Sequence, residues 1–134
     1  MDGDFAEQTG LPDFRQAPRP TRVYSGRRNE GANRVSVRDS SHPEAGPVER
    51  DLTPEASREI HDYSAQFDWG AETAGALQLS VALLLDVTGD PGVARRWCQL
   101  FAHKYVANLP QEWTVPEIDI DLWLYCFENE RPGA

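Results

Sequence analysis

Lysine is almost missing from this chain of 134 residues. Twelve of its 13 basic residues are arginine, and Lys104 is the one lysine. With 22 acidic residues, the formal charge at pH 7 is −9. Binding to the phosphate backbone of nucleic acid depends on clustered lysine and arginine. The shortage of positive charge therefore argues against direct nucleic-acid binding. It also indicates a soluble protein with a halophile-like composition.

The excess of negative charge lies mainly in the second half of the sequence. Residues 1–57 hold ten acids and eight bases, a net charge of −2. Residues 58–134 hold twelve acids and five bases, a net charge of −7. An acidic surface of this kind can meet a basic partner or imitate nucleic acid. We expect another protein as the partner.

Cysteine and long apolar runs are also scarce. Cys98 and Cys126 both fall in apolar helical patterns, so we expect buried thiols rather than a disulfide. No stretch approaches the roughly 20 apolar residues that a membrane-spanning helix needs. The first ten residues lack the basic start and apolar core of a secretory signal. We therefore expect a cytoplasmic protein with no membrane contact.

The densest apolar segment, residues 69–86, predicts the central helix of the fold. Ala74, Leu77, Val81 and Leu84 recur with the spacing of one helix face, and further leucines widen that face. We expect this helix to be largely buried. The segment Gly89-Asp90-Pro91 then predicts a helix end followed by the capped start of another helix.

Flanking segments predict strands and two further helices. Residues 23–26 and 33–39 form a β-hairpin pattern, and residues 47–52 allow a third strand. Thr53 before Pro54 predicts the start of a short helix that reaches about His61. Thr114 and Glu117 have the spacing of a capping box and open a predicted helix that ends near residue 127.

This last helix has apolar residues on two faces. Ile118, Leu122, Tyr125 and Cys126 mark one face, and Ile120, Trp123 and Phe127 mark the other. Such a pattern indicates either burial between two surfaces or one face kept for a partner.

These elements together predict an α+β fold. We expect an N-terminal antiparallel β-hairpin, or a small three-stranded sheet, packed against a short helix and three longer helices. Residues 21–130 form the predicted single domain. Residues 1–20, with three prolines, are predicted to be a flexible or docking arm that Phe5, Leu11 and Phe14 could pin to an apolar surface.

The best candidates for catalysis are Asp68, Glu72 and His61, close in sequence to Trp69. An acid beside an aromatic ring can have its pKa raised by desolvation, as general-acid chemistry requires. No phosphate-binding loop, nucleophile elbow or paired-histidine motif accompanies them. The two cysteines and two of the histidines lack the close spacing of a zinc site, and Glu117, Asp119 and Asp121 suit a helix start better than a cation site. We therefore predict no metal and no cofactor. By default we interpret Asp68, Glu72 and His61 as solvated loop side chains.

Two further sets of residues are candidates for interactions. Trp69 and Trp123 belong to a group of four tryptophans, most of which we expect in the core. An exposed pair would mark an interaction hot spot. The one basic patch lies on or beside the predicted hairpin and is either a solvated sheet face or a site for an anion or an acidic partner. It consists of Arg27, Arg28, Arg34 and Arg38.

Several short motifs, spread over residues 22–127, resemble a known family. They are Tyr24-Ser25-Gly26, Leu52-Thr53-Pro54, Ser57, Ser64, Phe67-Asp68-Trp69-Gly70, Gln78-Leu79, Leu83-Leu84-Leu85-Asp86, Trp113 and Trp123-Leu124. This pattern is similar to the domain of unknown function 6166 family of small proteins from prokaryotes and mobile elements. Relatives tend to have an aromatic residue and a glycine-rich turn after the position of Gly70, where this chain has Ala71-Glu72-Thr73. The resemblance supports the fold and implies no established activity.

The composition and motifs favour a non-enzymatic function. We expect a small, acidic intracellular binding or accessory protein, such as viruses and plasmids encode, that acts through protein–protein interaction. One alternative is a small enzyme that uses the acids and histidine near Trp69. The other is an acidic mimic of nucleic acid that inhibits a nucleic-acid-binding protein.

Overall fold

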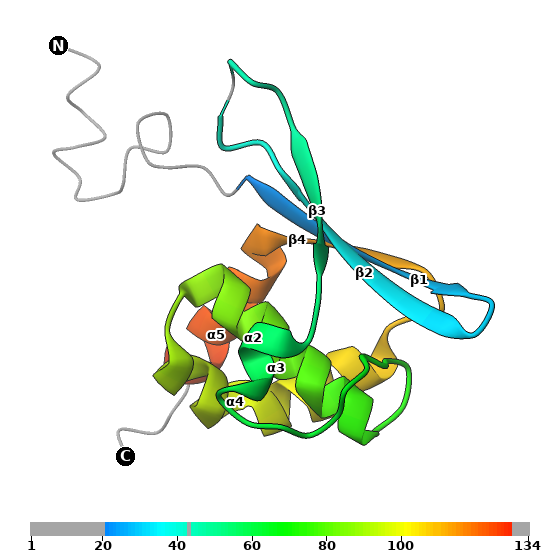
Figure 1. Ribbon diagram of the computed structural model, residues 1–134. Coiled ribbons are helices and arrows are strands. Elements are labelled where there is room, and N and C mark those ends of the chain that lie inside the picture. Colours follow the sequence, from blue (N-terminus) through cyan, green and yellow to red (C-terminus); the bar gives the residue numbers. More distant parts are fainter. Residues whose placement is uncertain (1–20, 43, 130–134) are drawn as a thin grey trace, which may run out of the picture.

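The structure, a computed structural model, describes residues 21–42 and 44–129. These residues form one four-stranded antiparallel sheet with helices packed against one of its faces (Figure 1). The prediction of an α+β fold is confirmed. The predicted arm, residues 1–20, and residue 130 of the predicted domain lie outside the described residues.

The sheet is built around the predicted hairpin. Strands β1 (Arg22–Asn29) and β2 (Ala32–Asp39) are longer than predicted and pair through a two-residue turn, in which Gly31 has a φ of 72°. Only glycine adopts this left-handed conformation without strain. β3 (Val48–Leu52) is the predicted third strand, and β4 (Trp113–Pro116) is a fourth that the sequence did not predict. The strand order is β3-β2-β1-β4.

The helices follow the predicted stop and start signals closely in the middle of the chain. The central helix α3 (Ala74–Thr88) begins where the Thr73 hydroxyl accepts a hydrogen bond from the Ala76 N–H, and it ends at Gly89 in a left-handed conformation. Helix α4 (Pro91–Lys104) begins after Asp90, whose carboxylate accepts from the Gly92 N–H. The remaining elements are α2 (Glu55–Arg58), a short 3₁₀ turn η1 (Val106–Asn108) and α5 (Glu117–Asn129).

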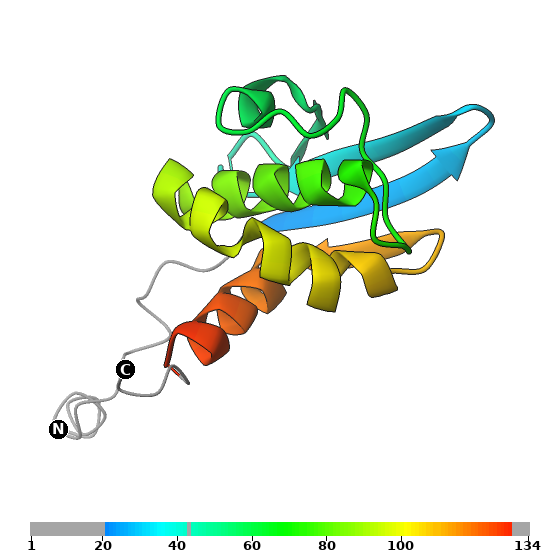
Figure 2. The same cartoon turned by 90° about the horizontal axis from the view of Figure 1, so that it is seen from below.

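Helix α3 lies across the inner face of the sheet, with α4 beside it and α5 next to β4 (Figure 2). Nine of its fifteen residues are buried, which confirms the prediction of a buried central helix. Its leucines and valine pack with Tyr24, Val35 and Val37 from the inner face of the sheet. Burial of each large aliphatic side chain contributes about 1.5–3 kcal/mol before chain entropy is counted.

Two predicted helix starts were wrong in detail. Thr114 does not cap a helix, because residues 113–116 form β4 and pair with Gly26 to Val23 on β1. Glu117 instead accepts hydrogen bonds from the main-chain N–H groups of Thr21 (3.3 Å) and Arg22 (3.2 Å). The short helix α2 starts one residue late, with Pro54 rather than Thr53 at its N-cap, and it ends at Arg58.

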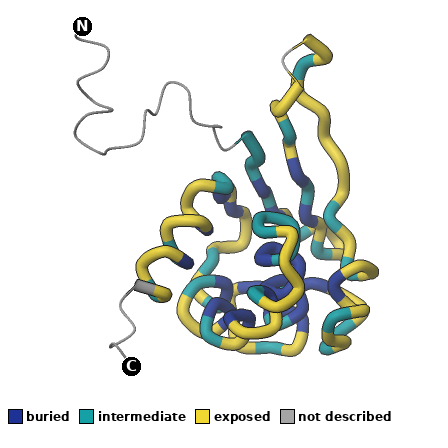
Figure 3. The backbone as a smooth tube through the Cα atoms, turned by 90° about the vertical axis from the view of Figure 1, so that its left-hand side faces the viewer, coloured by how far each residue is buried: buried dark blue, intermediate teal, exposed yellow. Residues whose placement is uncertain are grey.

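The cysteines differ in burial. Cys98 on α4 is buried, as predicted, and Cys126 on α5 is exposed, so the prediction of two buried thiols was wrong. The reason is that, within the part of the chain that the structure describes, Cys126 lies on the side of α5 that packs against no other element and is exposed with its neighbour Tyr125. Figure 3 shows how burial varies along the backbone, with the exposed residues in yellow. Among the described residues, no helix has both the length and the apolar content required to cross a membrane.

Candidate functional site

The Asp68 carboxylate is held by an arginine of β1 and by the loop that precedes α3. Its Oδ1 accepts from Arg28 Nη1 at 2.9 Å and from the Trp69 N–H at 2.8 Å, and its Oδ2 accepts from the Thr73 hydroxyl at 3.0 Å. Burial alone would raise the pKa of Asp68, but these hydrogen bonds outweigh it and lower the pKa below its ordinary value. Asp68 is therefore an ionised carboxylate that holds the start of α3 in place.

Arg28 and Trp69 are part of the same internal arrangement. The Arg28 guanidinium lies 4.7 Å from the centre of the Trp69 ring and donates to the Trp69 carbonyl. Trp69 is 1% exposed, contacts Trp113 edge-on at 5.6 Å, and donates from Nε1 to the Gln111 carbonyl. Of the predicted interaction residues, these two are thus committed to contacts inside the fold.

The three catalytic candidates have different neighbours. The Glu72 carboxylate lies 2.9 Å from His103 Nδ1 on α4, and both side chains are more than half exposed. His61 is exposed and its ring stacks on Tyr63 at 4.0 Å. Neither contacts Asp68. In residues 21–42 and 44–129, no three His, Cys, Asp or Glu side chains are grouped so that they could hold a metal.

A buried glutamine, which the sequence did not single out for a role, fixes the loop between α2 and α3. Gln78 is 0% exposed. Its Oε1 accepts from the N–H groups of Tyr63 (2.7 Å) and Ser64 (3.0 Å). Its Nε2 donates to the Ser57 hydroxyl (2.8 Å) and the His61 carbonyl (3.1 Å). All four hydrogen-bonding positions of the amide are used, and the one signal in the sequence was a glutamine inside an apolar helical run.

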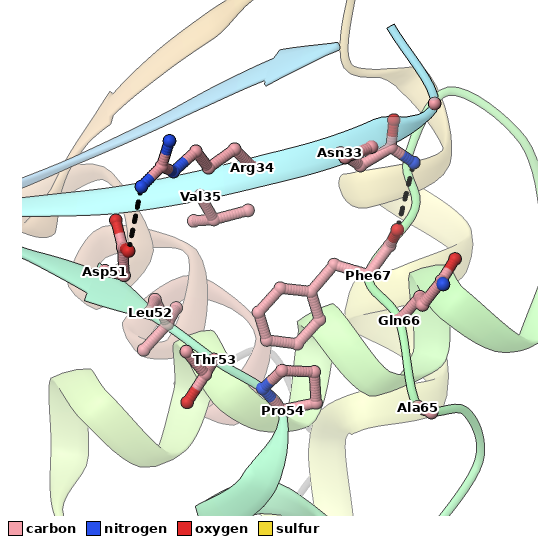
Figure 4. A pocket seen from close by; sticks show the side chains of 12 residues that line it. Asn33, Arg34, Val35, Asp51, Leu52, Thr53, Pro54, Ala65, Gln66 and Phe67 are labelled. Carbon is pink, nitrogen blue, oxygen red and sulfur yellow. Dashed lines mark hydrogen bonds and ion pairs between the residues drawn. The ribbon is translucent and has the colours of Figure 1, made fainter. Parts of the chain in front are cut away.

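The loop that Gln78 holds forms one wall of a pocket of about 220 Å³ (Figure 4). The ring of Phe67 forms part of the pocket wall and lies among Val35, Leu52 and Pro54, which add further apolar surface. Two polar contacts frame the opening. Arg34 Nη2 lies 3.2 Å from Asp51 Oδ2 at one end, and Asn33 Nδ2 donates to the Phe67 carbonyl at 3.0 Å at the other.

The outer face of the sheet carries the other predicted arginines. Residues on β1 and β2 alternate between the helix side and the open side, and Arg27, Arg34 and Arg38 are exposed on the open side. Arg27 and Arg34 are directly opposite each other across the two strands. They line a second hollow of about 440 Å³, which shares Arg34 and Asp51 with the pocket. The Arg34–Asp51 ion pair therefore separates an apolar pocket from a polar hollow that is lined by Arg27 and Arg34 and by Glu49 and Asp51.

Helix α5 presents a different kind of surface. Trp123 lies on its inner side, 4.9 Å from Phe101 and 4.3 Å from Phe127 between ring centres, so it contributes to the core. The outer side carries large apolar side chains that are well exposed, at 43% for Ile118, 55% for Leu122 and 65% for Tyr125. We name these three residues the outer stripe of α5. Their spacing of four and three residues places them in line along the helix.

Helix α5 carries four acidic residues and no basic residue. Asp119 and Asp121 are exposed on the helix that bears the outer stripe. Glu117 instead accepts hydrogen bonds from the main chain of Thr21 and Arg22, and Glu128 accepts one from Trp97 Nε1. The pKa of Asp121 is raised above its ordinary value, mainly by partial desolvation and to a smaller extent by the negative charge of Glu117. Glu117 and Asp121 are four residues apart and therefore lie on the same side of the helix.

A comparison with known families matched residues 24–125, from β1 into α5, to the domain of unknown function 6166 family. The chain belongs to this family of unknown function. No curated protein and no solved structure was found to match the chain. The matched segment includes the pocket, the Gln78 network and the whole outer stripe, so these features lie in the part of the chain that defines the family.

Proposed function

We propose that this member of the family is a non-enzymatic binding protein that engages another protein through the outer stripe of α5. The observation that carries the proposal is the exposure of Ile118 and Leu122 on a helix that has acidic but no basic residues. We infer that the protein acts in the cytoplasm as an accessory factor, a location supported by its two free cysteines, because thiols stay reduced there.

Burial of the outer stripe on binding would be favourable. A single exposed leucine is ordinary on a protein surface, but apolar side chains in line on one helix form a continuous strip. Covering one fully exposed large aliphatic side chain contributes about 1.5–3 kcal/mol. Ile118 is 43% and Leu122 is 55% exposed, so about half of each remains to be buried, and the two together offer roughly 1.5–3 kcal/mol to a complementary surface. This is the arrangement by which helices bind grooves and other helices.

The charges around the stripe favour a basic partner. Asp119 and Asp121 are exposed on α5, and residues 58–134 as a whole carry a net charge of −7. Complementary charge on the partner would speed association and select against acidic surfaces, and both effects weaken as salt is added. The partner that fits is therefore a protein segment with apolar side chains flanked by lysine or arginine.

The placement of Asp68, Glu72 and His61 supports a binding role over an enzymatic one. Asp68 is ionised by its hydrogen bonds to Arg28 and neighbouring groups, whereas a general acid at neutral pH needs a raised pKa. Glu72 and His61 contact other residues and do not meet Asp68.

The test is capture of a partner from lysate of the native host by the tagged chain and by two matched variants. Leu122→Ser removes the centre of the outer stripe. Val48→Ser removes a similarly exposed aliphatic side chain, at 51%, on β3 at the far edge of the sheet. We expect the Leu122 variant alone to lose the captured protein, and we expect a photo-crosslinker at position 122 to trap it.

Each alternative has its own outcome in this experiment. Equal capture by both variants, or crosslinks to nothing, would show that the outer stripe is not the binding surface. Capture of a nucleic-acid-binding protein through residue 122 would identify the chain as a nucleic-acid mimic. A crosslink to a second copy of the chain, with a doubled mass in light scattering, would identify a homodimer instead.

A further inference from the structure

The edge of the sheet is open beside the Phe67 pocket. β3 pairs with β2 only from Val35 to Asp39, and the last pair is Val35 with Leu52. Continued in the same register, Asn33 would face Pro54, which has no N–H to donate. The chain there already turns into α2.

The main chain of Asn33 points toward this open edge. A two-residue turn joins β1 and β2, so Asn29 and Ala32 close the ladder as a hydrogen-bonded pair. Along a strand, the N–H and C=O groups of successive residues point alternately to the strand on one side and to the strand on the other. Those of Ala32 point to β1, so those of Asn33 point to the side of β3. β2 thus offers one donor and one acceptor where β3 has left the sheet.

The pocket on the inner side of this edge matches one apolar side chain. Its volume of about 220 Å³ lies below the roughly 300–1,000 Å³ of pockets that take drug-sized ligands. Phe67 and Val35 line it and are themselves buried, so the pocket has a firm apolar wall. An aliphatic or aromatic side chain entering here would lose water on most of its surface.

Two arginines lie on the outer side of the same edge, at the end nearest the turn between β1 and β2. Arg27 and Arg34 are directly opposite each other, which is unfavourable for like charges. Arg34 has Asp51 as a partner at 3.2 Å, but the pair is exposed. Within the described ranges, Arg27 has no ion pair. The same hollow is also lined by the hydroxyls of Ser25 and Ser36 and by the acidic residues Asp51 and Glu49. Asp51 is the partner of Arg34, and Glu49 is opposite Arg38, farther from the turn than Arg27. The unpaired positive charge is therefore that of Arg27, at the end of the hollow nearest the turn.

We propose that an extended segment of a partner protein, in which apolar and acidic residues alternate, adds to the sheet at the free edge of β2. Its main chain pairs with Asn33. Alternate residues of a strand point to opposite faces, so an apolar side chain enters the Phe67 pocket while the adjacent acidic side chain lies over Arg34 and Arg27. This is strand addition, a common mode of peptide recognition. It is independent of the function proposed for α5.

The test uses the whole chain and three labelled, capped heptapeptides, with binding followed by fluorescence anisotropy. In the first peptide glutamate alternates with leucine, in the second lysine replaces glutamate, and in the third the residues of the first are reordered to break the alternation. We expect the first peptide to bind with a dissociation constant below about 1 mM, and at least threefold more tightly than either of the others. The main-chain amide resonance of Asn33 is expected to shift on titration.

Matched variants separate the two halves of the site. Arg27→Gln is expected to weaken the glutamate peptide about twofold to fivefold, the range of an exposed ion pair, while Arg95→Gln, at an exposed arginine on α4, leaves it unchanged. Ala65→Trp fills the mouth of the pocket and is expected to weaken binding at least fivefold. Ala71→Trp places the same side chain at an exposed alanine outside the pocket and serves as its control.

Three results would overturn the proposal. They are the absence of binding by the alternating glutamate peptide to the intact chain, equal binding of the glutamate and lysine peptides, and binding that neither Arg27→Gln nor Ala65→Trp weakens. The peptide assay is also independent of α5. Leu122→Ser is expected to leave peptide affinity unchanged, so loss of the α5 interaction and loss of strand addition are told apart.

Discussion

Replacing Gln78 with leucine should destabilise the protein more than most single substitutions in the core. Leucine has a similar volume and keeps α3 apolar, so no large cavity forms. It removes both acceptor and donor functions of an amide that makes four hydrogen bonds. The partners left behind include the N–H groups of Tyr63 and Ser64 and the carbonyl of His61.

The loss in free energy of unfolding depends on how many of these polar groups water cannot reach in the variant. Leaving a buried polar group without a partner costs about 1–3 kcal/mol. Tyr63 and Ser64 are half-buried, so water can reach part of their main chain, and we count two to three groups at the lower end of that range. We expect a loss of about 2–4 kcal/mol, a large part of the roughly 5–15 kcal/mol that stabilises a typical domain.

Urea denaturation followed by tryptophan fluorescence measures this loss. Ser57→Ala is the matched comparison, because it removes only the hydroxyl that Gln78 Nε2 contacts, and we expect it to cost about 1 kcal/mol. A loss below about 1 kcal/mol for Gln78→Leu, with an unchanged dependence on urea, would refute the view that this amide holds the loop between α2 and α3.

Three further outcomes follow from the contacts in the structure. A Cβ at Gly26 would lie 2.3 Å from the Trp113 indole, so Gly26→Ala should lower the free energy of unfolding by about 1–3 kcal/mol or more in thermal or urea denaturation. A thiol reagent should label exposed Cys126 quickly and Cys98 only slowly, as mass spectrometry of digested protein can show, because Cys98 is buried and burial raises its pKa. Asp68 has a lowered pKa when folded, so its stabilising effect is present above the unfolded value of 3.8 and is lost as the pH falls through the folded value. Asp68→Asn should therefore be less stable than the parent chain at pH 5–7, with the difference shrinking below about pH 4.

The parts of the fold that the sequence predicted well are those set by local chemistry. The glycine at position 89 ends α3, and Asp90 with Pro91 starts α4, because caps and proline act over one helical turn. The hairpin followed from its turn residues and alternating valines. These signals do not depend on what the rest of the chain does.

Strand β4 could not be predicted in this way, because its extended conformation depends on pairing with β1, which lies about 90 residues earlier in the sequence. Trp113 pairs with Gly26, where the lack of a side chain leaves room for the indole. Thr114 and Glu117 have capping-box spacing, yet Glu117 is hydrogen-bonded to main chain more than 90 residues earlier. Long-range pairing thus outweighed a plausible local signal.

The candidate site shows the same limit. Tryptophan content indicates that some rings could be exposed, but only the packing shows that Trp69 and Trp123 face inward. The two apolar faces of α5 were visible in the sequence, and the structure leaves the Ile118 side exposed. Arg27, Arg34 and Arg38 remain predicted interaction residues, now placed together on the open face of the sheet.

Asp68 and the buried Gln78 have a structural role in this protein. Asp68 and Gln78 both form hydrogen bonds that hold the loop between α2 and α3. This loop places Phe67 in the pocket wall. Groups committed in this way cannot also take part in proton transfer without losing the loop. What remains available to other molecules is surface: an acidic helix face with an apolar stripe, and a sheet edge between a pocket and two arginines. Both surfaces are those through which we propose that the protein binds its partners.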